Sequence, residues 1–285
     1  MKNIILGKVE QNHDILESIL SFLDVCTLIE KKTVCKRWNK ICELTIDHKA
    51  LFSPSGKQPF KSNQELRDVI SKYVKTKDNP ILTEEIAISY GWPIAKWNVS
   101  LLEDFSDAFH SKYEFNEDID TWDLSNARNL SFMFAHASSF NRNISCWDTS
   151  KVENMKGMFN AASSFNGDVS SWDTKNVKSM IGLFGGAFLF NQDISFWDTT
   201  KVQNMSGMFC AASSFNRDIS SWNTKNVQYM EYMFFNACSF KQDISSWDIT
   251  NVESMKGMLQ GASSFDQDVS SWNVKNVESL KKFTQ

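Results

Sequence analysis

Apolar residues recur along most of this chain at a fixed spacing of 25 residues. An aromatic residue stands seven positions before each of the tryptophans that mark the spacing, and Ile or Val stands three positions before it. The tryptophans are Trp97, Trp122, Trp147, Trp172, Trp197, Trp222, Trp247 and Trp272. Such a period is typical of repeat proteins, in which each turn buries its apolar face against its neighbours. The pattern predicts eight stacked turns with buried aromatic and aliphatic ladders.

The two halves of each repeat have different apolar patterns. After each tryptophan the apolar steps are 3, 3, 1 and 3, which is the spacing of one helix face. One such set is Val152, Met155, Met158, Phe159 and Ala162. Capping-box pairs, such as Ser150 with Glu153, recur every 50 residues at the expected helix start. The first half, as in residues 193–198, is too short for a helix and predicts a short strand. The repeats therefore predict an α+β repeat solenoid of about eight turns, each a short strand plus a helix.

Both ends of the repeat array carry features that predict caps. Upstream, Ser62 and Glu65 form another capping box. A helical stripe follows at Leu66, Val69, Ile70, Tyr73 and Val74. We expect this helix to cover the first turn and protect its edge. Downstream, the polar residues Lys281, Lys282 and Thr284 predict a minimal C-terminal cap.

The N-terminal part of the chain has a pattern of its own. Apolar residues from Ile15 to Leu23 follow a helical spacing, and two further short apolar sets end at Ile41. These sets predict a compact all-α bundle within residues 12–52, and the Ser, Pro and Gly residues of 53–59 indicate a loop after it. The expected domains are a helical domain at 1–52, a linker with a capping helix at 53–89, and the solenoid at 90–285.

Composition and charge narrow the classes of function. The 285 residues are 42% hydrophobic and 22% charged, which is ordinary for a globular protein, and the net charge of -4 disfavours nucleic acid and anionic membranes as partners. The N-terminus has no signal-peptide pattern and no segment is long enough to span a membrane. The six cysteines form no C-x-x-C pair. We expect reduced cysteines and an intracellular protein of the cytoplasm or nucleus, or of a host cell if a virus or pathogen makes it.

Two recurrent residue types have alternative interpretations. The Trp and Phe ladders are either core, which their shared phase with Ile and Met favours, or stacking platforms for single-stranded nucleic acid or sugar. The aspartates around each tryptophan, such as Asp168 and Asp198, either make turns or hold calcium. Asparagine replaces some of them, as at Asn143 and Asn223, which favours turns.

The sequence contains no set of residues that predicts catalysis. The four histidines, at positions 13, 48, 110 and 136, have no partner at a motif spacing, although His110 and His136 lie one repeat apart. No Gly-rich phosphate loop and no metal-ligand cluster is present. We therefore predict no enzyme, no catalytic residue, no cofactor and no metal.

A partner site on the solenoid is expected where residues break the consensus without breaking the core. The stretch 181–196 does so most, because apolar residues replace polar or small ones there, and exposed apolar clusters mark interfaces. The candidate substrate-binding residues are Ile181, Phe188, Leu189 and Phe196, with Arg142 and Arg217 adding polar contacts. The alternative is that this repeat packs differently from the others.

The repeat unit resembles a known family. Its pattern F-N-x-D-I-S-x-W-D-T-S-x-V-x-N-M-x-x-M-F-x-x-A-S-S, over residues 90–285, is similar to the BspA-type leucine-rich repeats. The resemblance implies a leucine-rich-repeat-like solenoid used for protein binding or adhesion, without naming a ligand.

The N-terminal segment resembles a second family, the F-box. The string from His13 to Asp24, followed by Leu28 and by residues 34–38, carries the likeness, while Asn12-His13 replaces the usual Leu-Pro. The resemblance implies binding to the Skp adaptor, and so to the cullin-RING ligase called SCF. The implied contact residues are Ile15, Leu16, Ile19, Leu20, Leu23, Val34, Cys35 and Trp38.

Together the two resemblances imply a substrate-recognition adapter of an SCF-type ubiquitin ligase. The F-box-like end would hold the Skp adaptor and the repeats an unknown protein substrate, so that the chain supplies proximity while partner subunits transfer ubiquitin. The alternative function is a non-catalytic interaction or adhesion solenoid without a ligase role.

Overall fold

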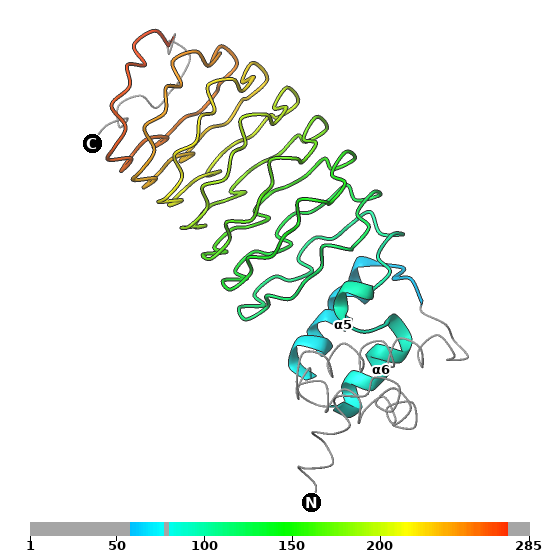
Figure 1. Cartoon of the computed structure of the whole chain (residues 1–285). Helices are drawn as coiled ribbons and strands as arrows, with labels where there is room; N and C mark the ends of the chain where they lie inside the picture. Colours follow the sequence, from blue (N-terminus) through cyan, green and yellow to red (C-terminus); the bar gives the residue numbers. More distant parts are fainter. Residues whose placement is uncertain (1–57, 77–79, 273–285) are drawn as a thin grey trace, which may run out of the picture. The chain divides into compact units, whose positions relative to one another are not determined.

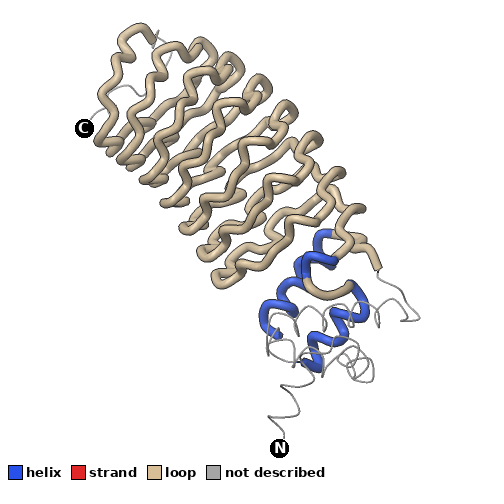
Figure 2. Tube along the Cα trace, in the orientation of Figure 1, coloured by secondary structure: helices blue, strands red, loops and turns tan. Residues whose placement is uncertain are grey.

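The computed structural model describes residues 58–76 and 80–272, with three helical elements. Helix α5 spans Asn63–Thr76 and helix α6 spans Pro80–Tyr90, and a short 3-10 helix, η1, spans Ile94–Lys96. Every other described residue lies in turns and loops, as the tan tube of Figure 2 shows.

The chain divides into two compact units. In its described parts, the first unit comprises residues 58–60, 68–76 and 80–99, and the second comprises residues 61–67 and 100–272. We call residues 100–272 the coil stack. The expected helical bundle of residues 12–52 and the polar ending at Lys281, Lys282 and Thr284 lie outside the described residues.

Helix α5 forms where the capping box predicted it. The Ser62 hydroxyl accepts a hydrogen bond from the Glu65 backbone N–H at 3.2 Å, so one donor of the first turn is satisfied. Its buried face consists of Leu66, Ile70 and Tyr73. The Asn63 amide at its start donates to the Ser106 carbonyl at 3.0 Å and to the Asp104 carboxylate at 3.2 Å. The predicted helix is confirmed, and Asn63 joins its start to the first coil of the stack.

Helix α6 was not predicted from the sequence. Pro80 opens the helix, where a missing N–H costs nothing, and Gly91 ends it with φ +100°. The Gly91 N–H still bonds the Ala87 carbonyl at 3.0 Å. Apolar residues dominate the segment without forming a single stripe, so its periodicity gave no signal.

The first unit has an aromatic core. Phe60 stacks on Tyr90 with ring centroids 4.3 Å apart, and Tyr73 meets the edge of Trp97 at 5.5 Å. The Phe60 N–H also donates to the Asn98 carbonyl at 3.0 Å. Residues 90–99, which the 25-residue period assigns to the first repeat, therefore pack with the helices of this unit.

The coil stack consists of 25-residue coils that lie side by side in chain order (Figure 1). Isolated parallel bridges join successive coils at one position in each, from Asp104↔Asn129 to Tyr229↔Ser254. The tryptophans at this register are buried, and the indole N–H of Trp147 donates to the carbonyl of Ile119 in the preceding coil at 3.1 Å. The predicted register and the core interpretation of the aromatic ladders are confirmed.

The predicted α+β fold class is wrong. Within the described part of the coil stack, residues 100–272, there is no helix and no strand. The first half of each repeat, where a strand was expected, lies in turns and unassigned backbone, as at residues 193–198. The isolated bridges lie in the second half, seven residues after each tryptophan from Trp97 to Trp247. The expected capping boxes do not form there either, because the Glu153 N–H donates to the Arg128 carbonyl of the preceding coil at 2.8 Å.

Hydrogen bonding between coils explains why the helical spacing gave turns. The N–H groups of Met155, Gly157 and Phe159 donate to carbonyls of the next coil, at 2.7 to 3.1 Å. The N–H groups of Met158 and Asn160, on either side of Phe159, donate instead to carbonyls three residues back in the same coil. Gly157 has φ +59°, a left-handed conformation that interrupts an α-helix. Apolar steps of three thus arise from consecutive tight turns whose alternate N–H groups bond the neighbouring coil.

Candidate binding site on the coil stack

Charged side chains pair between coils along one outer row. This sixth-position row holds the sixth residue after each tryptophan: Glu103, Arg128, Glu153, Lys178, Gln203, Gln228 and Glu253. Arg128 lies 3.4 Å from Glu103 and 3.1 Å from Glu153, and Lys178 lies 2.5 Å from the other oxygen of Glu153. The hydrogen bond from Lys178 lowers the pKa of Glu153 below its usual range. Charges alternate and pair up to Lys178, and two neutral amides follow.

A second outer row shows the same change. This fourth-position row holds the fourth residue after each tryptophan from Trp122 to Trp247: Asn126, Lys151, Asn176, Lys201, Asn226 and Asn251. The ammonium of Lys151 donates to the Asn126 carbonyl oxygen at 2.8 Å, and that of Lys201 donates to the Asn176 oxygen at 2.7 Å. After Lys201 the alternation ends, because two asparagines follow in succession.

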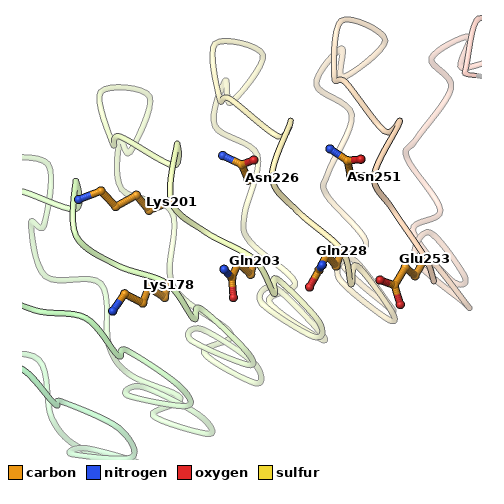
Figure 3. A pocket seen from close by; sticks show the side chains of 7 residues that line it. All are labelled: Lys178, Lys201, Gln203, Asn226, Gln228, Asn251 and Glu253. Atoms are coloured by element: carbon orange, nitrogen blue, oxygen red, sulfur yellow. The ribbon is translucent and has the colours of Figure 1, made fainter.

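A pocket of about 500 Å³ lies where both alternations end. We call it the amide pocket, and Figure 3 shows its two rows of side chains across successive coils. Its lining consists of Lys178, Lys201, Gln203, Asn226, Gln228, Asn251 and Glu253. Cations therefore stand at one end of the pocket and a carboxylate at the other, and the remaining four lining residues are neutral amides.

Hydrogen bonds hold several side chains of the pocket in place. The Nδ2 groups of Asn226 and Asn251 donate to the carbonyls of Thr200 and Lys225, both at 2.7 Å. At the far end, the Tyr229 hydroxyl donates to Glu253 at 2.9 Å, and this bond raises the pKa of Tyr229. The asparagine amides are thus oriented by the backbone of the preceding coil.

These pocket residues were not predicted from the sequence. Each is a common surface residue, and none disturbs the 25-residue consensus. A signal was nevertheless present, because Glu, Arg, Glu and Lys alternate at intervals of 25 residues until Gln203 and Gln228 follow. Comparing one surface position across all repeats would have found it.

The apolar candidates for substrate binding are mostly on the surface. Phe188 is 50% exposed, Leu189 is 55% exposed and Phe196 is 84% exposed, while Ile181 is half-buried. Serine occupies the positions of Phe188, Leu189 and Phe196 in the next coil.

The two candidate arginines make contacts within the coil stack. Arg142 Nε donates to the Asn116 carbonyl of the preceding coil at 2.7 Å, and Arg217 Nε donates to the Asn191 carbonyl at 2.8 Å. Gln192, at the same repeat position, makes the equivalent bond to the Asn166 carbonyl. Part of each guanidinium therefore serves to hold adjacent coils together.

The aspartates predicted to make turns do so. Asp168 accepts a hydrogen bond from the Ser170 backbone N–H at 2.9 Å, and Asp198 accepts one from the Thr200 N–H at 2.9 Å. These bonds lower the pKa of both carboxyls, with the backbone N–H the main cause at Asp168 and the Thr200 hydroxyl at Asp198. Asn143 takes the same role toward Ser145. The turn interpretation is confirmed, and no group of three metal-ligating residues occurs among the described residues.

Two histidines come together as their spacing suggested. The rings of His110 and His136 stack with centroids 5.7 Å apart, and His110 Nδ1 lies 2.6 Å from an Asp107 oxygen. His136 is exposed and His110 is half-buried. Their spacing of about one repeat thus places them on neighbouring coils, as surface side chains.

The implied Skp-contact residues lie outside the described residues. They are Ile15, Leu16, Ile19, Leu20, Leu23, Val34, Cys35 and Trp38. No helix among the described residues is long and apolar enough to cross a bilayer.

Stacked coils with a constant interior and variable outer rows define a repeat protein. The family model described as "Mycoplasma protein of unknown function, DUF285" matches residues 84–195 and 179–285. The chain belongs to this family. No curated protein and no solved structure matches the chain. The family match leaves residues 1–83 outside, and these include the F-box-like segment.

Proposed function

We propose that the chain is a non-catalytic substrate adapter of an SCF-type ubiquitin ligase. Its N-terminal segment, residues 12–52, binds the Skp adaptor, and its coil stack binds a protein substrate. The adapter works by proximity, because it holds a substrate near a ligase whose other subunits carry out the transfer. An intracellular location follows from this role.

The contrast between the interior and the surface of the coil stack supports the binding role. Each interior position repeats nearly the same residue in every coil. Outer positions vary: the sixth-position row changes from charged residues to glutamines, and the exposed Phe196 stands where the next coil has serine. A constant scaffold with variable surface rows is the arrangement that repeat proteins use for recognition. The ligase role is supported by the residue pattern of the N-terminal segment.

Binding of the full-length chain to a purified Skp adaptor tests the proposal. We expect co-elution on size exclusion, and loss of co-elution after Ile19→Asp with Leu20→Asp, since charge on an apolar contact face opposes docking. Leu101→Asp is the matched control, because Leu101 is 62% exposed and lies in the coil stack. An unchanged Tm of the coil stack would show that the first variant leaves it folded. Failure of the unaltered chain to bind the adaptor overturns the ligase role.

A second candidate function is a plain interaction or adhesion protein. The observation that favours it is the extent of the family match, which covers residues 84–285 and leaves out the F-box-like segment. In this case the double variant at Ile19 and Leu20 captures its partner normally and ubiquitination in cells is unchanged. Measuring both in the same cells separates the two functions.

A further inference from the structure

The amide pocket lies where the ion pairs of the sixth-position row and the lysine–asparagine bonds of the fourth-position row both stop. In the described coil stack, the sixth-position row is ion-paired from Glu103 to Lys178, and lysines of the fourth-position row cover the asparagine oxygens up to Asn176. Both patterns end by Lys201. Because two independent rows lose their partners at the same coils, the change creates one surface with unused polar groups.

The groups left in the pocket match those of a peptide backbone. Within the described residues, the side-chain amides of Gln203 and Gln228 make no hydrogen bond, and no lysine reaches the Asn226 oxygen in the way that Lys201 reaches the oxygen of Asn176. Each side-chain amide offers the same N–H donors and carbonyl acceptor as a peptide group. The pocket is therefore equipped to bond an extended chain at several points.

The charges at the two ends give the pocket a direction. Lys201 and Glu253 belong to different rows and lie two coils apart along the stack, which is about 10 Å in that direction at the usual spacing of bridged chains. An extended peptide covers that length in about three residues. An acidic side chain of a ligand can thus meet Lys201 while a basic one meets Glu253.

Other ligand classes fit the pocket less well. No aromatic ring lines it, so a nucleobase or a sugar ring has no face on which to stack. Lys178 is already paired with Glu153, and the carboxylate of Glu253 repels phosphate. A polypeptide needs neither a stacking platform nor a net positive surface.

We propose that the amide pocket binds an extended segment of a protein partner that carries an acidic and a basic residue about three positions apart. This inference rests on the proposed binding role of the coil stack and specifies the chemistry of what it binds. It is independent of whether the N-terminal segment binds the Skp adaptor.

The test closes the pocket by extending the alternating charges of the sixth-position row across it. The double substitution Gln203→Glu with Gln228→Lys continues the alternation from Glu103 to Glu253, so each new charge finds a partner in the adjacent coils. The control, Glu103→Gln with Arg128→Gln, alters two residues of the same row outside the pocket. Full-length protein is used to select binders from a random dodecapeptide display library, and affinities are measured for the unaltered chain and both variants.

We expect selected peptides with acidic and basic residues about three positions apart, at least a tenfold loss of affinity in the pocket-closing variant, and unchanged affinity in the control. The pocket-closing variant should keep the Tm of the unaltered chain. Absence of binders, or binders that the closed variant retains, overturns the inference. Binding of a neutral hexasaccharide that closure abolishes, without any peptide binding, also overturns it. Skp-adaptor binding, measured on the same variants, reports separately on the ligase role.

Discussion

Residues 100–201 and residues 202–272 of the coil stack can be compared position by position, because they repeat the same 25-residue unit. Their interiors are alike: Phe159 stacks on Phe165 at 3.8 Å, and Phe209 stacks on Phe215 at 3.9 Å. Their sixth-position rows differ, because ion pairs join the side chains of the first stretch, whereas the neutral amides of Gln203 and Gln228 follow in the second. The core therefore fixes where each surface position lies, and the residue type at that position is free to change.

The largest effect should come from the shared core, and it should be equal in the two stretches. Phe159→Ala and Phe209→Ala each remove a ring that is 0% exposed, which should cost about 3–5 kcal/mol of unfolding free energy. Urea denaturation of the full chain measures both. Phe196→Ala is the control, because an 84% exposed ring buries little on folding. A clearly smaller loss in one stretch would show that the two interiors are not equivalent.

An intermediate effect should distinguish two glycines at the same repeat position. Gly157 and Gly207 have φ +59° and +63°, so alanine at either costs about 1–2 kcal/mol of backbone strain. A Cβ at Gly157 would also lie 2.4 Å from the Phe132 ring, whereas at Gly207 the nearest atom is 3.9 Å away. We expect Gly157→Ala to lower the Tm more than Gly207→Ala.

The Phe132 ring can be tested as the cause of that difference. Adding Phe132→Ala to Gly157→Ala should reduce the extra cost of the glycine substitution to the level seen at Gly207. If Gly157→Ala and Gly207→Ala instead have equal Tm values, the Phe132 ring shifts freely and the steric explanation fails.

The smallest effect should be the loss of the surface ion pairs in the first stretch. Glu153→Gln removes the pairs with Arg128 and Lys178 and should cause a small fall in Tm that disappears at high salt. Gln228→Ala, in the second stretch, should show no such salt dependence. Thermal unfolding at low and high salt compares them, and equal salt dependence would contradict the assigned difference between the rows.

The stability contributed by the Glu153–Lys178 pair depends on pH in a definite direction. The folded-state pKa of Glu153 is lowered, chiefly by its hydrogen bond from Lys178. Its contribution is therefore fully present above the ordinary glutamate pKa and is lost as the pH falls through the lowered value. The Tm difference between the unaltered chain and Glu153→Gln should vanish over that acidic range.

Several features could be predicted because they depend on residue identity at short range or at a fixed period. The capping box at Ser62 and Glu65 specifies the start of helix α5, and Asp168 and Asp198 bond backbone groups two residues on. The burial of Trp147 followed from its place in the repeat. For the capping box and the aspartates the physical cause lies in near neighbours in sequence, and for Trp147 it is the fixed period.

Other features depended on contacts between coils. Thr149 is 1% exposed, and its hydroxyl donates to the carbonyl of Asp173, one coil ahead. Nothing about an isolated threonine indicates such a partner. The exposed Phe188, Leu189 and Phe196 were found from the sequence as departures from the consensus. The change to amides in the sixth-position row was also visible in the sequence, but that this row and the fourth-position row line one pocket depended on contacts across coils.

Which positions are inside follows from the sequence, because identical apolar residues every 25 positions have no other way to be buried than by stacking. The backbone conformation of each coil depends instead on contacts with the neighbouring coils. An N–H such as that of Gly157 can bond within its own segment or to the next coil, and the neighbouring carbonyl at 2.7 Å selects the second. The amide pocket has the same origin, since partners 25 residues apart decide which polar groups are satisfied and which remain for a ligand.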